Sequence, residues 1–253
     1  MLLALLTGFL AFAGRANAQV NPNWDHYHVY TVAPHPSSGF HVSLIDQFGA
    51  TPHTVQVMNY FANPVQKQHG ALVFPINNPQ LHYTWWVLDP QPFSKDVIAS
   101  NQFGDQPLHL SEIDYLLAPA LKNAPAGQPL PVANHYKCYA CQGNAVNVPV
   151  TLVDQFFGRS ALVGFPRFFC TPTDKIVQET GQTFPMTDPN QHYTVYEIDP
   201  ISTGFSATVR DQFLIQGGTV SFPLSVMLMV PTTKSFPTPT ESHTWGRLKT
   251  LYR

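Results

Sequence analysis

Apolar and polar residues alternate along several short stretches of this chain. Phe40, Val42 and Leu44 fall on one side of the first such stretch, and the alternation returns within residues 148–152 and 205–209. A period of two residues is typical of β-strands with one buried face. Beyond residue 18 no stretch shows the period of an amphipathic helix, so the pattern predicts an all-β chain.

The pattern recurs four times, and each copy opens with a His-Tyr pair. The four pairs are His26-Tyr27, His82-Tyr83, His135-Tyr136 and His192-Tyr193. Subtracting the positions of the histidines gives steps of 56, 53 and 57 residues. So regular a period indicates tandem copies of one supersecondary unit.

Each copy also carries an Asp-Gln-Phe or Asn-Gln-Phe triplet, called the turn element below, and closes with a Pro and a Lys. The turn elements are Asp46-Gln47-Phe48, Asn101-Gln102-Phe103, Asp154-Gln155-Phe156 and Asp211-Gln212-Phe213. The closing pairs are Pro64 with Lys67, Pro119 with Lys122, Pro172 with Lys175, and Pro231 with Lys234. We therefore delimit repeat 1 as residues 26–67, repeat 2 as 82–122, repeat 3 as 135–175 and repeat 4 as 192–234.

A unit of this size buries too little apolar surface to be stable alone, so neighbouring repeats are expected to pack together. The expected fold is four tandem small antiparallel β repeats packed into sandwich-like pairs or a stack, with a four-bladed propeller as the alternative. Residues 235–253 form a C-terminal tail, where His243-Thr244-Trp245 is interpreted as a truncated fifth opening strand.

The turn element is expected to supply structural anchors. Its aromatic residues, predicted to anchor the core, are Phe48, Phe103, Phe156 and Phe213. Its first residues are Asp46, Asn101, Asp154 and Asp211. An acidic residue at a turn can close an Asx-turn, bind calcium or transfer protons. Asn101 keeps the hydrogen bond but lacks the charge, which favours the turn over the other two roles.

The repeated histidines and lysines are also given structural roles. A metal cluster would require the four histidines to converge on one axis, whereas tandem copies normally lie far apart. Each His is therefore expected to hydrogen-bond to neighbouring backbone, and each closing Lys to cap loop carbonyls or pair with a carboxylate. No metal site and no cofactor are predicted.

The first residues indicate an exported protein. Residues 2–12 are apolar and Ala16-Asn17-Ala18 is a small-x-small cleavage site, so residues 1–18 are interpreted as a signal peptide, although no Lys or Arg precedes the apolar run. The run is short for a membrane span. We expect a secreted protein, extracellular or periplasmic, with no membrane span after cleavage.

Charge limits the classes of partner. Charged residues make up 11% of the chain, the formal net charge is −2, and the 13 Lys and Arg form no basic stripe, which argues against nucleic-acid binding. Weakly charged surfaces repel one another little. Self-association, or contact with extracellular matrix or carbohydrate, is therefore the expected kind of partnership.

Three cysteines, Cys138, Cys141 and Cys170, all fall in repeat 3. In an oxidising compartment two of them are expected to pair. Alignment of the repeats places each of the three in an otherwise apolar column, as expected for core positions. The residues favour Cys138 with Cys170, but a bridge in which Cys141 replaces Cys138 stays open.

Signatures of catalysis are lacking: the chain has no nucleophile elbow, no zinc-protease helix motif and no phosphate loop. The leading hypothesis is a secreted, non-catalytic structural or adhesive module, or a subunit of an extracellular assembly. The alternative is a carbohydrate- or small-ligand-binding protein that uses Trp24, Trp85, Trp86 and Trp245 as stacking platforms. A hydrolase without a recognisable motif is the weakest hypothesis, and it predicts an asymmetric pocket joining unlike residues of different repeats.

Repeat 3 also resembles an uncharacterised secreted repeat domain of bacteria. The resemblance rests on His135-Tyr136-Lys137-Cys138-Tyr139, on Asp154-Gln155-Phe156 and on the segment 170–175. It extends to all four repeats, and it implies a small extracellular β domain in which Cys138 and Cys170 are paired. Repeats 1, 2 and 4 lack both cysteines, so the bridge is optional for the fold. The family is a domain of unknown function, and it implies no activity.

Overall fold

The computed structural model describes residues 20–36, 39–125 and 127–237. The proposed signal peptide and the proposed fifth opening strand lie outside these ranges. The described residues form antiparallel β-strands and no helix, which confirms the prediction of an all-β chain built from small antiparallel repeats.

Each repeat consists of an opening strand, an arm that ends at the turn element, and a long closing strand. Repeat 1 comprises β1 (His26–Pro36), β2 (His41–Asp46) and β3 (Gly49–His69), and repeat 2 comprises β5 (His82–Asn101) and β6 (Gly104–Lys122). Repeat 3 comprises β7 (His135–Gln142), β8 (Val148–Val153) and β9 (Gly158–Val177), and repeat 4 comprises β11 (His192–Arg210) and β12 (Gly218–Ser235). Short strands β4 (Leu72–Phe74) and β10 (Thr183–Phe184) follow repeats 1 and 3. In repeats 2 and 4 the opening strand and the arm are one continuous strand.

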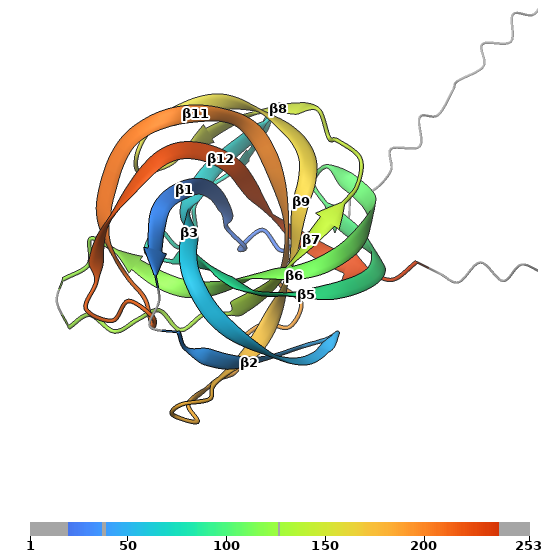
Figure 1. Ribbon diagram of the computed structural model, residues 1–253. Helices are drawn as coiled ribbons and strands as arrows, with labels where there is room; N and C mark the ends of the chain where they lie inside the picture. Colours follow the sequence, from blue (N-terminus) through green and yellow to red (C-terminus); the bar gives the residue numbers. More distant parts are fainter. Residues whose placement is uncertain (1–19, 37–38, 126, 238–253) are drawn as a thin grey trace, which may run out of the picture.

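The opening and closing strands pair in a closed ring. The order of pairing is β1, β3, β5, β6, β7, β9, β11, β12 and back to β1. Figure 1 shows these strands encircling a common centre. Neighbouring repeats thus meet edge to edge in one sheet, and not only face to face, because each opening and closing strand offers a free edge to the next repeat.

Inside the ring, each opening strand places an apolar residue directly opposite one from its own closing strand. The four pairs are Val29 with Ala62, Trp85 with Leu117, Cys138 with Cys170, and Val195 with Met229. All but one of these pairs are simple packing contacts. In repeat 3 a Cys138–Cys170 disulfide joins Cα atoms 4.0 Å apart, which confirms the predicted pairing, and Cys141 is free and buried.

A closed set of four tyrosines occupies the centre of the ring. They are Tyr27, Tyr83, Tyr136 and Tyr193, the second residue of each repeat. Successive rings meet edge to face, with centroids 5.2, 5.5, 5.2 and 5.9 Å apart, and the last pair returns to Tyr27. Edge-to-face contact is the favoured geometry of aromatic pairs. The four repeats therefore share one aromatic centre.

Each arm extends beyond its own repeat and pairs with the closing strand of the repeat two places along the chain. β2 pairs with β9, the end of β5 with β12, β8 with β3, and the end of β11 with β6. This exchange of arms carries every turn element onto the opposite repeat. The geometry of those contacts defines the candidate site.

Candidate functional site: the repeat junctions

The first residue of every turn element closes a local turn. Its side-chain Oδ1 accepts the backbone N–H of the Phe two residues later. The distances are 2.9 Å at Asp46, 2.9 Å at Asn101, 2.8 Å at Asp154 and 2.8 Å at Asp211. This is the Asx-turn geometry expected of a short polar side chain at a turn. It uses only one of the two polar atoms of each side chain.

The second polar atom reaches the opposite repeat. Asp46 Oδ2 accepts from Tyr139 at 2.7 Å, Asp154 Oδ2 from Tyr30 at 2.6 Å, Asp211 Oδ2 from Trp86 Nε1 at 2.7 Å, and Asn101 Nδ2 donates to Tyr196 at 2.9 Å. Repeat 2 tolerates Asn because its partner, the Tyr196 hydroxyl, also accepts and passes its own hydrogen to Gln106 at 2.5 Å. The carboxylates thus tie repeat 1 to repeat 3 and repeat 2 to repeat 4.

The Phe of each turn element packs edge-on against the same aromatic partner. The ring pairs are Phe48 with Tyr139, Phe103 with Tyr196, Phe156 with Tyr30 and Phe213 with Trp86, with centroids 5.3, 5.5, 5.4 and 5.4 Å apart. Phe213 is buried, and the other three are partly buried against the core. Each Phe therefore lies between repeats and not at the centre of its own repeat.

Three of the four turn-element glutamines join their repeat to the opening His of the repeat before it. Gln47 contacts the ring nitrogen of His192 at 2.9 Å, and Gln102 and Gln212 hydrogen-bond in the same way to His26 and His135. These opening histidines thus bond to a neighbouring side chain, and His192 Nδ1 also bonds to the Asn190 carbonyl at 2.9 Å. In the part of the chain that the structure describes, no group of three His, Cys, Asp or Glu side chains is placed to hold a metal ion.

The closing lysines are placed differently from the prediction. Among the described residues none of them caps a loop carbonyl or forms an ion pair with a carboxylate; each ammonium lies over the Phe of the next repeat's turn element. The pairs are Lys67 with Phe103, Lys122 with Phe156, Lys175 with Phe213 and Lys234 with Phe48, at 4.6, 4.2, 4.7 and 5.4 Å. Lys67 and Lys175 are fully buried, and burial lowers the pKa of each to about 7. An aromatic face attracts a cation, which explains the repeated position.

Repeat 2 departs from this arrangement. Lys67, Lys175 and Lys234 each have a second phenylalanine over the ammonium: Phe74, Phe184 and Phe236. Phe74 and Phe184 precede the next opening His by eight residues, and Gly127 stands at that distance before His135. Lys122 Nζ donates instead to Asn63 Oδ1 at 2.8 Å.

Asn63 is itself an exception among the repeats. The residue before the closing proline is Ala118 in repeat 2, Thr171 in repeat 3 and Val230 in repeat 4. Asn63 is fully buried, and among the described residues its Nδ2 has no hydrogen-bond partner. The sequence interpretation missed Asn63. The signal that could have found it is that no other repeat has an amide side chain before its closing proline.

The glutamine of this junction also departs from the others. Gln155 donates to the Pro79 carbonyl at 3.0 Å and does not reach His82. His82 Nδ1 bonds to the Gln80 carbonyl at 3.1 Å, while its Nε2 has no partner within the described part of the chain. The junction around Lys122 is therefore the one where three of the repeated contacts change together.

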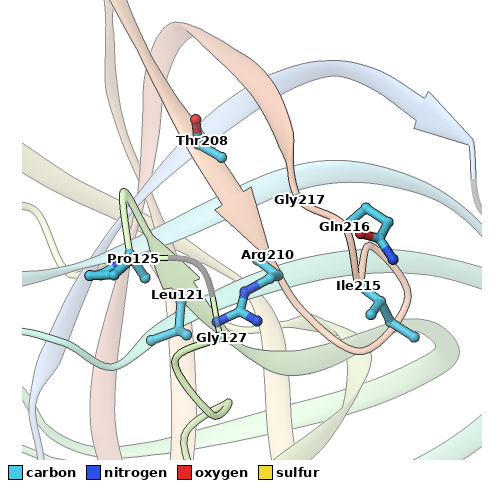
Figure 2. A pocket seen from close by; sticks show the side chains of 9 residues that line it. Leu121, Pro125, Gly127, Thr208, Arg210, Ile215, Gln216 and Gly217 are labelled. Atoms are coloured by element: carbon cyan, nitrogen blue, oxygen red, sulfur yellow. The ribbon is translucent and has the colours of Figure 1, made fainter.

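A cavity of about 290 Å³ lies next to Leu121, the residue before Lys122, and is lined by residues of repeat 4 and of the linker after repeat 2. Figure 2 shows Arg210 directed towards Gly127 and Leu121, with the loop that carries Ile215 on its other side. Repeat 4 has a longer loop after its turn element, and it faces the linker that follows repeat 2. The cavity therefore joins unlike residues of different repeats.

The two tryptophans of repeat 2 do not form exposed platforms. Trp85 and Trp86 are fully buried: Trp85 packs against Tyr60 and Tyr115, and Trp86 bonds to Asp211. Trp24 is partly buried, and Trp245 lies outside the described residues. Stacking of a sugar on the two central tryptophans is therefore excluded in this fold, because their faces are covered by protein.

Comparison with known proteins gives a family and no activity. A family model described as a repeat of unknown function (DUF7450) matches residues 12–111 and 82–222. No curated protein and no solved structure matches the chain. The two overlapping matches together cover most of the four repeats.

Proposed function

The chain belongs to the family of repeats of unknown function (DUF7450), and from its geometry we propose that it is a non-catalytic structural module of an extracellular assembly. One observation supports this most strongly. Most of the residues that recur in the repeats make contacts between repeats, so their recurrence is explained by closure of the ring within the chain.

The turn-element carboxylates illustrate the argument. The Asp46 and Asp154 side chains are fully buried, and each accepts hydrogen bonds from its own turn and from the opposite repeat. A general acid or base must reach a substrate proton at hydrogen-bond distance. These carboxylates face protein on every bonded side, which favours a structural role.

An extracellular location is part of the proposal. A disulfide links Cys138 to Cys170, and disulfides persist in oxidising compartments. The described residues include no helix of the length and hydropathy needed to cross a bilayer.

Self-association through strand β4 is the proposed mode of assembly. Leu72 and Val73 expose 59% and 52% of their surface on this strand, and β4 pairs only with β3 among the described strands. An unpaired strand edge carrying apolar residues is a template for pairing with another chain. The low charge of the protein opposes such pairing little.

Light scattering during size-exclusion chromatography tests this proposal over a range of protein concentrations. We expect the mass of wild-type protein to rise with concentration, and a Leu72→Lys, Val73→Lys variant to stay monomeric. Phe165→Lys is the matched control, because Phe165 is exposed to 51% on a different strand, β9. A monomeric wild type at every concentration would contradict the assembly role.

The cavity at Arg210 favours a second function, binding of a small anion with an apolar tail. The Arg210 guanidinium provides a positive charge, and Leu121 and Ile215 provide apolar contact. Calorimetry with hexanoate tests this function, with hexanamide as the uncharged control. Binding of hexanoate that is lost in Arg210→Gln supports it, and no binding of hexanoate to wild type contradicts it.

A further inference from the structure

The contact between Lys122 and Asn63 brings an amine against a carboxamide inside the protein. Lys122 Nζ lies 2.8 Å from Asn63 Oδ1, so the carboxamide carbon is within reach of the amine nitrogen. Reacting atoms held about 3–3.5 Å apart are in a near-attack arrangement. The two residues belong to β6 and β3, strands that do not pair with each other.

The surroundings favour a neutral, nucleophilic amine. The Phe156 ring lies 4.2 Å from Lys122 Nζ, and both Lys122 and Asn63 are buried. Burial lowers the pKa of Lys122 to about 8, although the charge of Asp154 acts in the opposite direction. Desolvated lysines with a lowered pKa are the ones that act as nucleophiles.

A carboxylate stands beside this pair. His28 lies opposite Asn63 in the β1–β3 ladder, and its Nδ1 is 3.1 Å from Asp154 Oδ2. In the corresponding place on the opposite side of the ring, Thr171, the counterpart of Asn63, donates to Asp46 at 2.5 Å. By this correspondence Asp154 belongs to the same junction as Asn63, and its charge acts on Lys122.

Tyr30 and His82 are titratable side chains near Asp154 and Lys122. Tyr30 donates to Asp154, and His82 stacks on Phe61 with its Nε2 unpartnered among the described residues. Burial alone would raise the pKa of Asp154, but hydrogen bonds from His28 and Tyr30 outweigh it and hold that pKa below the ordinary value. Asp154 therefore holds a negative charge beside the amine.

We propose that Lys122 and Asn63 form an intramolecular isopeptide bond, a covalent cross-link between repeats 1 and 2 that is made once the chain has folded. The Lys122 ammonium first loses a proton to solvent, and the free amine adds to the Asn63 carboxamide carbon. Asp154 then accepts a proton from the added nitrogen, which is positively charged, and passes it to the original amide nitrogen. One C–N bond forms and one breaks, the amide nitrogen leaves as ammonia, and no oxidant or cofactor takes part.

The rest of the ring provides an internal comparison. Lys234 is the counterpart of Lys122 on the opposite side of the ring. The charge of Asp46 acts to raise the pKa of Lys234, as the charge of Asp154 does for Lys122. Its neighbour in the place of Asn63 is Thr171, which has no carboxamide. Lys67 and Lys175 have no hydrogen-bond partner among the described residues. Within the described part of the chain, only the Lys122 junction joins a buried amine to a buried amide.

Mass spectrometry of the purified full chain tests the proposal. After reduction of the disulfide, the wild-type mass should be lower than that of its residues by one ammonia. A tryptic digest should contain one branched peptide in which the chain around Asn63 is joined to the chain around Lys122. Trypsin should fail to cleave after Lys122.

Three variants identify the reacting groups. Asn63→Thr copies the residue found at Thr171, and Lys122→Met removes the amine; both should abolish the branched peptide. Asp154→Asn keeps the local turn, as Asn101 does in repeat 2, and should leave folded protein with at least a tenfold lower extent of cross-linking. Lys234→Met is the matched control and should retain it fully.

Recovery of separate, unmodified peptides containing Asn63 and Lys122 from folded wild-type protein would overturn the proposal, as would conversion of Asn63 to Asp without a branch. The proposal stands apart from the assembly role, because the mass spectrum reports the bond whether or not the protein self-associates.

Discussion

Trp86 donates its indole N–H to the Asp211 carboxylate at 2.7 Å, although the two residues are 125 positions apart in the chain. Trp86 belongs to the opening strand of repeat 2, and Asp211 begins the turn element of repeat 4. The same carboxylate oxygen also accepts from Thr84. One buried carboxylate thus holds two repeats that are not neighbours in sequence.

The first prediction concerns the charge of Asp211. Asp211→Asn turns an acceptor into a donor that faces the Thr84 and Trp86 donors, leaving buried donors unpaired. An unpaired buried polar group costs about 1–3 kcal/mol. We expect a loss of this size in the free energy of unfolding, measured by urea denaturation. The matched control is Asp105→Asn at an exposed hairpin position, which should change the value little.

Repeat 2 explains why the same substitution is tolerated elsewhere. Asn101 donates to the Tyr196 hydroxyl, and that hydroxyl has a further acceptor in Gln106. Equal stability of Asp211→Asn and wild type would show that the carboxylate does not tie the repeats together.

The second prediction concerns pH and the buried lysines. The pKa of Lys67 is about 7 in the folded protein and 10.5 in an unfolded chain. Between these values the unfolded state holds a proton that the folded state lacks, so stability rises with pH from about 7 towards 10. The slope contributed by one lysine is at most about 1.4 kcal/mol per pH unit.

Lys67→Met should remove this slope and make the protein more stable at pH 7, because an apolar side chain replaces a buried amine without a hydrogen bond. Urea denaturation at pH 7, 8 and 9 measures the difference from wild type. Lys95→Met, at an exposed position, is the control and should keep the wild-type slope. The same slope in Lys67→Met and wild type would contradict the burial of this lysine.

The third prediction concerns the disulfide. Repeat 1 has Val29 and Ala62 where repeat 3 has Cys138 and Cys170, so Cys138→Val with Cys170→Ala copies a pair the fold already accepts. The bridge spans a separation of 32 residues, and closing such a loop stabilises a protein by about 3–4 kcal/mol. We expect the variant to fold but to lose about this much stability.

Denaturation with and without a reducing agent checks the explanation. Reduced wild type should match the double variant, and the variant itself should not respond to reduction. An unfolded variant would mean that the bridge is required for the fold.

The sequence was sufficient to predict the local features of the fold. Alternation predicts strands because side chains in a strand point to opposite faces, and the recurring His-Tyr and turn elements delimit the repeats. The apolar columns of Cys138 and Cys170 predict facing core positions, and the structure pairs those columns directly in all four repeats.

The contacts between repeats could not be predicted in this way. The repeated Asp indicates a recurring turn, but the residues next to it in the sequence do not indicate that its partner is Trp86 or Tyr30, two repeats away. The closing lysines looked exposed because lysine is rarely buried, and only the arrival of a Phe from another repeat covers them. Asn63 differs from the residues at the same position of the other repeats, but its contact with Lys122 forms only when the ring closes.

Hydrogen–deuterium exchange of Phe213→Ala tests the central claim, that the turn elements bind the four repeats into one cooperative unit. Removing this buried ring should cost about 3–5 kcal/mol. If the repeats act as one unit, protection of slowly exchanging amides should fall by the same factor in β1, β5, β7 and β11. A loss confined to repeat 4, with repeats 1 to 3 protected as in wild type, would contradict the account.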